Sequence, residues 1–121
     1  MGGRGQGPTP GMLGRAALGS CLTIGYQLHA TRLGVDLTSL TVTVEADSDD
    51  GAMLSPDSGN RPGYSDVRYH VEIVSPAPEE LLLRLLDEAD SLSPYRDIFA
   101  REIPLERTAE IRRPSHRPPT T

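Results

Sequence analysis

The chain of 121 residues has no tryptophan and no lysine, and its only cysteine is Cys21. One cysteine cannot form a disulfide within the chain, which argues against a disulfide-stabilised secreted domain. Aromatic residues make up only 4% of the sequence. A hydrophobic core must therefore be built mainly from Leu, Val, Ile and Ala. No run approaches the roughly 18 apolar residues of a membrane span, and the N-terminus has no apolar stretch typical of a signal peptide. We therefore expect a soluble, cytoplasmic protein.

The formal net charge of −5 argues against a nucleic-acid partner, which would call for a basic face. The three histidines are scattered and none is paired with a cysteine, so we expect no metal site and no cofactor. The segment from Asp47 to Gly51 faintly resembles a calcium loop. However, Ser58 occupies the position of the bidentate glutamate, and we expect a solvated turn.

A long helix is predicted after a flexible, glycine-rich leader over residues 1–8. Thr9 is suited to cap the helix, Pro10 to begin it and Gly34 to end it. Apolar residues then recur every three or four positions, which predicts a stripe that faces the core. The members of this stripe are Leu13, Ala17, Cys21, Ile24 and Leu28.

Two strands are predicted next. Residues 40–46 alternate apolar and polar side chains, as a half-buried strand does, and residues 67–73 repeat the pattern. The stretch between them, 47–63, is rich in Asp, Ser, Gly and Pro and is predicted as a loop. Two strands joined by a loop are most simply an antiparallel pair.

The second half of the chain predicts a helix over 78–89, a short helix from Ser93-Pro94 to Ala100 and a final strand over 103–111. Residues 113–121 are predicted as a disordered tail. The fold class is therefore α+β, with an antiparallel sheet packed on a long central helix in one domain over residues 9–112.

Several motifs in this order resemble the OsmC/Ohr family, the osmotically inducible and organic-hydroperoxide-resistance proteins. The first is the helix motif from Pro10 to Cys21, and strand motifs follow from Gly34 to Glu45 and from Tyr64 to Ile73. The remaining motifs are Ala77-Pro78-Glu79-Glu80-Leu81, Ser93-Pro94-Tyr95 and Ile103-Pro104-Leu105.

The resemblance implies an intertwined homodimer with its sites at the subunit interface. It also implies that Cys21 is a peroxidatic thiolate that attacks an organic hydroperoxide and becomes a sulfenic acid. An external thiol would then reduce the sulfenic acid. Ser93 and Pro94 would stand beside the thiol. Tyr95 and Phe99 on the short helix have two interpretations: they line an apolar substrate slot, or they pack in the core.

The sequence departs from the family pattern in three places. Ser93 stands where a resolving cysteine is expected, and Gly11 and Met12 stand where the family places its helix glutamate. Strands that normally precede the helix, one of them with an activating arginine, have no counterpart here. Arg4 is the one basic residue before the helix. We expect either a start that lies further upstream or a short member of the family.

Two interpretations of Cys21 stay open. In the first, Ser93 and the N–H groups at the start of the short helix stabilise its thiolate, and the protein is a one-cysteine peroxidase. In the second, Cys21 is an inert, buried side chain and Ser93 only caps its helix. The protein would then be a non-catalytic dimer that binds an apolar small molecule or acts as a scaffold.

Overall fold

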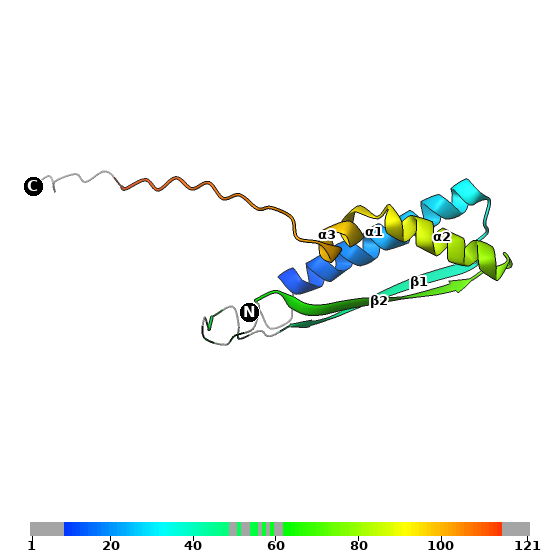
Figure 1. Cartoon of the computed structure of the whole chain (residues 1–121), viewed down its shortest axis with the longest axis horizontal. Helices are drawn as coiled ribbons and strands as arrows, with labels where there is room; N and C mark the ends of the chain where they lie inside the picture. The colour runs from blue at the N-terminus through cyan, green and yellow to red at the C-terminus, as the bar shows by residue number, and fades with distance from the viewer. Residues whose placement is uncertain are drawn as a thin grey trace, which may run out of the picture.

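The computed structural model describes residues 9–48, 51, 54, 55, 57, 59 and 62–114. The elements in chain order are α1 (Pro10–Leu33), β1 (Ser39–Ser48), β2 (Tyr64–Val74), α2 (Glu79–Ser91) and α3 (Pro94–Ala100). The helices lie over one face of a two-stranded sheet (Figure 1). The predicted α+β architecture is therefore confirmed. The predicted leader lies outside the described residues, as does most of the predicted tail.

The long helix α1 begins and ends where the sequence predicts. The Thr9 hydroxyl accepts the backbone N–H of Met12 at 3.2 Å, and Pro10 is the first helical residue. At the other end Gly34 adopts a left-handed conformation with φ of 69°, and its N–H donates to the carbonyls of Ala30 and Thr31. Glycine suits this position because a Cβ atom would be strained there.

The strands β1 and β2 pair antiparallel, as predicted. Leu40 faces Ile73, Val42 faces Val71 and Val44 faces Tyr69 across the ladder. These six side chains are half-buried and point toward the helices, whereas the alternate positions are exposed. The hairpin therefore supplies one wall of the core.

The predicted core-facing stripe of α1 is wrong. Leu13, Ile24 and Leu28 are 56%, 52% and 66% exposed. The buried residues of the helix are instead Leu18, Leu22, Tyr26 and Ala30. Both sets recur with helical spacing, but the second contains an aromatic ring, which buries a large area against α2 and the sheet. The first set is left as an exposed apolar stripe.

The helix α2 begins at Glu79, so Pro78 lies at the N-cap and not inside the first turn as predicted. Its Leu85 is fully buried and packs with Ala30 and Val35. The short helix α3 follows after two residues, as predicted. Its position next to α1 brings the Ser93 end of α3 close to the middle of the long helix (Figure 1).

The predicted final strand over 103–111 is also wrong. Residues 102–114 form no helix or strand and extend away from the helices (Figure 1). Leu105 is 96% exposed and Ile111 is 84% exposed. A strand needs a partner for its backbone N–H and C=O groups, and this extended C-terminal arm (residues 102–114) pairs with neither of the strands in the described part of the chain.

Candidate active site

The structure brings Cys21 and Ser93 together. Their side chains, 72 residues apart in sequence, lie with Sγ and Oγ 3.5 Å from each other, and either atom can donate the hydrogen bond. Cys21 is half-buried on α1, whereas Ser93 is only 5% exposed. A thiol with a neighbouring hydroxyl is a candidate nucleophile, because a hydrogen bond to the charged form favours thiolate.

Ser93 is also the N-cap of α3. Its Oγ accepts the backbone N–H of Arg96 at 3.4 Å. This N–H therefore reaches the hydroxyl and does not point to the sulfur. Because the hydroxyl accepts from Arg96, its own proton remains to be donated, and Cys21 Sγ is the partner in reach among the described residues.

The other sequence-predicted site residues occupy different positions on α3. Pro94 is exposed at its first position, and Tyr95 is 43% exposed. Phe99 packs into the core and stacks on Tyr64, with their ring centroids 6.3 Å apart. Tyr95 is thus free to contact a bound molecule, whereas Phe99 is engaged in packing.

Cys21 lies at the border of the exposed apolar stripe of α1. At about 100° per residue, Leu13, Ile24 and Leu28 fall within about 80° of Cys21 around the helix. On α3, Ile98 is also exposed, at 42%. The thiol is therefore flanked by apolar surface on its own helix and on the neighbouring one.

A second polar cluster, which we call the tyrosine–aspartate cluster, lies between α1, α2, β2 and α3. It consists of Tyr26, Tyr69, Asp90 and Arg96. The hydroxyl groups of Tyr26 and Tyr69 donate to the Asp90 carboxylate at 2.5 and 2.8 Å. Arg96 Nε donates to the Tyr69 hydroxyl at 2.8 Å, and its guanidinium lies 6.0 Å from the centre of the Tyr69 ring.

Burial sets the protonation of this cluster. Tyr26 is fully buried, and burial together with the hydrogen bond to Asp90 raises its pKa far above the usual value of 10.0. Burial also raises the pKa of Tyr69, although the hydrogen bond from Arg96 opposes the shift. Both phenols therefore keep their protons at neutral pH and act as donors to Asp90. The pKa of Arg96 is raised because its guanidinium donates to Tyr69.

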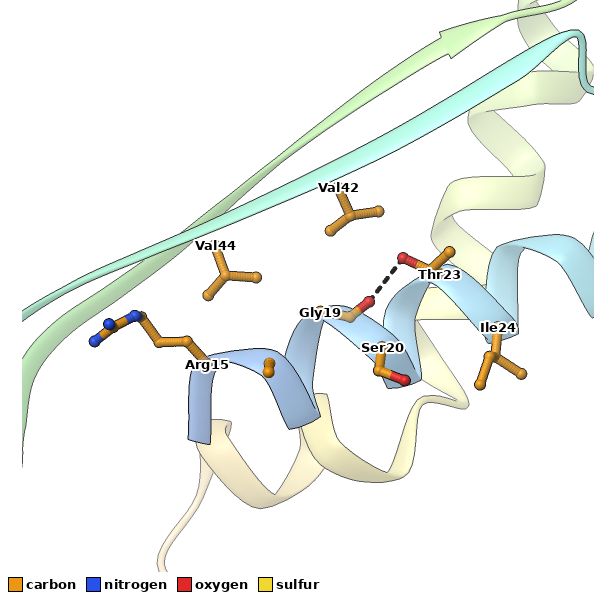
Figure 2. Close-up of a pocket in the computed structure, with 8 residues that line it drawn as sticks. Arg15, Gly19, Ser20, Thr23, Ile24, Val42 and Val44 are labelled. Atoms are coloured by element: carbon orange, nitrogen blue, oxygen red, sulfur yellow. Dashed lines mark hydrogen bonds between the residues drawn. The ribbon is translucent and has the colours of Figure 1, made fainter. Parts of the chain in front are cut away.

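A cavity of about 440 Å³ lies between α1 and β1, and Cys21 is not among the residues that line it (Figure 2). Val42 and Val44 project from β1 toward Gly19, Thr23 and other small residues of the helix. The Thr23 hydroxyl donates to the Gly19 carbonyl at 2.8 Å, and both residues line the cavity. Its lining mixes apolar side chains with Ser20 and Thr23, and Arg15 lies at one end.

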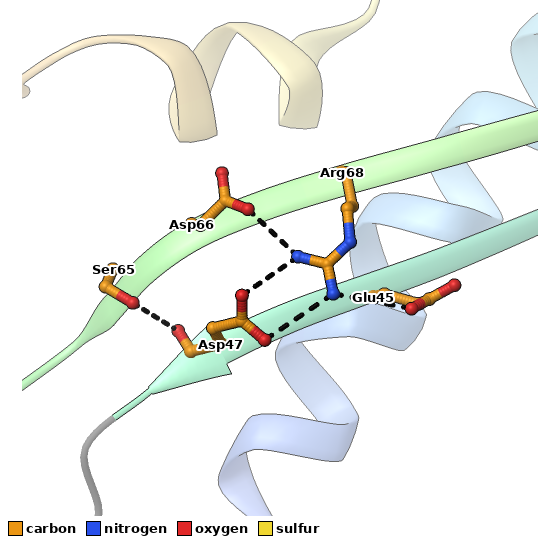
Figure 3. A network of polar contacts seen from close by, with 5 residues as sticks. All are labelled: Glu45, Asp47, Ser65, Asp66 and Arg68. Carbon is orange, nitrogen blue, oxygen red and sulfur yellow. Dashed lines mark hydrogen bonds and ion pairs between the residues drawn. The ribbon is translucent and has the colours of Figure 1, made fainter.

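The outer face of the hairpin carries an ionic cluster (Figure 3). The guanidinium of Arg68 pairs with Asp66 at 2.9 Å, Asp47 at 3.1 Å and Glu45 at 3.4 Å. These contacts raise the pKa of Arg68, mainly through Asp47. Every member is exposed, so the cluster lies on the surface opposite the helices, remote from Cys21.

Two kinds of feature are absent from the described part of the chain. No helix there is both long and apolar enough to cross a membrane. Nor do three or more His, Cys, Asp or Glu side chains come together in it to hold a metal ion. The weak calcium-loop pattern includes Asp49 and Asp50, which lie outside the described residues.

The chain is an α+β protein in which an antiparallel hairpin lies under a long helix. Its candidate thiol site is the half-buried Cys21, which faces the start of α3. The family model of the OsmC-like proteins matches residues 3–107. This match extends over most of the 121 residues, and the chain belongs to the OsmC-like family. No curated protein is significantly similar to it.

Solved structures support the fold. An OsmC-like protein from Mycoplasma pneumoniae is 20% identical, with a TM-score of 0.67, over 78% of this chain and 64% of that protein. An OsmC-like hydroperoxide resistance protein from Jannaschia sp. CCS1 is 17% identical, with a TM-score of 0.68, over 92% of this chain and 72% of that protein. The chain thus spans less than two thirds of the length of the first protein.

Sequence reasoning identified Cys21 and Ser93 but missed Tyr26, Asp90 and Arg96. Tyr26 stands four residues from Leu22 and Ala30, but the exposed apolar stripe of α1 has helical spacing as well, so the spacing did not single it out. Asp90 and Arg96 lie three residues before and after Ser93, but nothing in the sequence shows that they meet at one tyrosine.

Proposed function

We propose that this protein is a one-cysteine thiol peroxidase that reduces organic hydroperoxides. The single observation that carries the proposal is the 3.5 Å contact between Cys21 Sγ and Ser93 Oγ. Membership of the OsmC-like family supports it, as does the likeness to a hydroperoxide resistance protein. Cys21 is half-buried and so is not sealed in the core, which a nucleophile needs.

The chemistry requires one thiolate and two equivalents of an external thiol. Cys21 thiolate attacks the terminal oxygen of ROOH, the O–O bond breaks, and the alkoxide takes a proton and leaves as ROH. The sulfur is oxidised to a sulfenic acid. A first external thiol condenses with the sulfenic acid, which releases water and forms a mixed disulfide with Cys21. A second external thiol then exchanges with this mixed disulfide. This regenerates Cys21 and releases the oxidised disulfide.

The surroundings of the thiol suit an alkyl hydroperoxide more than hydrogen peroxide. Ile24 and Leu28 follow Cys21 on the exposed side of α1, and Ile98 is exposed on α3. An alkyl chain that covers such residues gains about 25 cal/mol for each Å² of apolar surface removed from water. The Ser93 hydroxyl is the polar group that stabilises the thiolate.

A second copy of this chain is proposed to cover the remaining apolar stripe. The extended C-terminal arm alternates side chains and exposes Leu105 and Ile111, as a strand without a partner does. The sheet over the described residues has only two strands, so each strand has an unpaired edge. If two copies exchanged their arms, each arm would gain a strand to pair with, and one open strand edge of each hairpin would be paired. The product would be a homodimer.

Turnover of cumene hydroperoxide with dithiothreitol tests the function. The wild-type protein is expected to consume the peroxide, and Cys21→Ser is expected to lose this activity. Dimedone should label position 21 of the wild type after exposure to peroxide, because it traps sulfenic acids. A rate that Cys21→Ser leaves unchanged, or no labelling of the folded wild type, would contradict the proposal.

A second candidate function is non-catalytic binding of an apolar small molecule. The cavity between α1 and β1 favours it, since its volume of about 440 Å³ falls in the range of ligand pockets and valines line one wall. The replacement Val44→Trp would fill this space without touching Cys21. Loss of binding of a fluorescent fatty acid in that variant, together with no turnover in the wild type, would favour this function.

A further inference from the structure

Ser93 belongs to a short segment that is held at both of its ends. Three residues before it, the Asp90 carbonyl accepts the backbone N–H of Ser93 at 3.3 Å. Three residues after it, the backbone N–H of Arg96 donates to Ser93 Oγ at 3.4 Å. The position of the Ser93 hydroxyl thus depends on where Asp90 and Arg96 are placed.

One phenol fixes both of these residues. The Tyr69 hydroxyl donates to Asp90 Oδ2 at 2.8 Å and accepts from Arg96 Nε at 2.8 Å. Its single proton is therefore committed to Asp90, and its lone pair to Arg96. Since Tyr69 belongs to β2, it ties the segment that joins α2 and α3 to the paired strands of the hairpin.

The same carboxylate is also tied to the helix of the thiol. The hydroxyl of Tyr26, five residues after Cys21 on α1, donates to Asp90 Oδ1 at 2.5 Å. Tyr26 is fully buried, and no buried side-chain nitrogen or oxygen of the described residues lacks a partner. A closed network of this kind rigidifies the groups that it joins.

We propose that Tyr69 is a positioning residue that holds the Ser93 hydroxyl against Cys21. This inference deepens the proposed function, on which its catalytic meaning rests. Tyr69 touches neither the sulfur nor, in this proposal, the peroxide. It acts through Asp90 and Arg96, and so through the segment that carries Ser93.

The test removes one oxygen atom. Tyr69→Phe keeps the ring but loses the bridge between Asp90 and Arg96. Tyr64→Phe is the matched control, because its hydroxyl donates to the Gly11 carbonyl at 2.5 Å and its ring stacks on Phe99 of α3. Both variants lose one phenol oxygen next to α1 and α3, but only Tyr69 is connected to the Ser93 segment.

The readout is the rate of Cys21 alkylation by iodoacetamide as a function of pH. Ser93→Ala and Tyr69→Phe are each expected to move the midpoint of this profile to higher pH. At neutral pH they should slow alkylation roughly tenfold, the loss expected for one hydrogen bond. Tyr64→Phe should leave the profile unchanged. In the double variant, Tyr69→Phe should add nothing to Ser93→Ala, because the two changes break the same contact.

An additive effect in the double variant would overturn the inference, as would a wild-type profile in Tyr69→Phe or in Ser93→Ala. If Tyr69→Phe fails to fold, as judged by circular dichroism, Arg96→Met removes the α3 side of the bridge at a half-buried position and should cause the same shift. Alkylation needs no peroxide. A wild type without peroxidase turnover therefore rejects the proposed function alone, and an unshifted Tyr69→Phe rejects this inference alone.

Discussion

The two faces of α1 differ in how much of their apolar surface the chain itself buries. On one face Leu18, Leu22 and Tyr26 are buried by elements of the same chain, and the single polar group there is hydrogen bonded. On the opposite face Leu13, Ile24 and Leu28 remain more than half exposed. Both faces have helical spacing of apolar residues, so spacing alone does not show which face a chain buries by itself. Cys21 lies where the two faces meet.

The largest expected difference between the faces is in stability. Leu22→Ala is expected to lower the free energy of unfolding by about 2–5 kcal/mol, because it opens a cavity in a fully packed site. Leu28→Ala makes the same change on the same helix at an exposed position. It should cost less than about 0.5 kcal/mol at concentrations where the protein is monomeric. Urea unfolding at such a concentration measures both, and equal losses would contradict the assignment of the buried face.

An intermediate effect is expected from the polar group of the buried face. Because the pKa of Tyr26 is raised above its unfolded value of 10.0, its stabilisation is complete below pH 10 and is lost as the pH rises above that. Between pH 9 and 11 the unfolded state releases this proton and the native state does not, which costs about 1.4 kcal/mol. Urea unfolding at pH 9, 10 and 11 should show a smaller alkaline loss in Tyr26→Phe than in the wild type. A parallel decline in the two proteins would rule out this protonated phenol.

The smallest expected effect concerns the end of α1, outside both faces. Gly34→Ala should destabilise the protein by about 1 kcal/mol, since alanine is strained at a φ of 69° and no atom lies close enough to clash with its Cβ. Thermal unfolding measures this loss. An unchanged midpoint would mean that the helix ends in another conformation.

Local signals predicted the elements but not their partners. Thr9, Pro10 and Gly34 gave correct ends for α1 because caps depend on neighbouring residues. Alternation gave β1 and β2 for the same reason. The burial of Tyr26 and the meeting of Asp90 with Arg96 depend on contacts between elements distant in sequence, which a single chain does not reveal. The strand predicted over 103–111 failed because its pattern indicates an extended chain, not the edge with which it would pair.

The predicted proximity of Cys21 and Ser93 came from resemblance and not from local pattern. The structure agrees with it, since the two atoms lie 3.5 Å apart. The residues that hold Ser93 in place could not be inferred in this way. They act through side chains that converge from four elements.

The ionic cluster around Arg68 has a consequence for solubility. Long hairpins with unpaired edges tend to stack edge to edge into aggregates, and charged side chains near an edge oppose this. Glu45, Asp47 and Asp66 outnumber the single guanidinium that they surround, so this end of the hairpin carries excess negative charge and repels another copy. Salt screens such exposed charges. We therefore expect the protein to aggregate more readily at high ionic strength, where the repulsion between hairpins is lost.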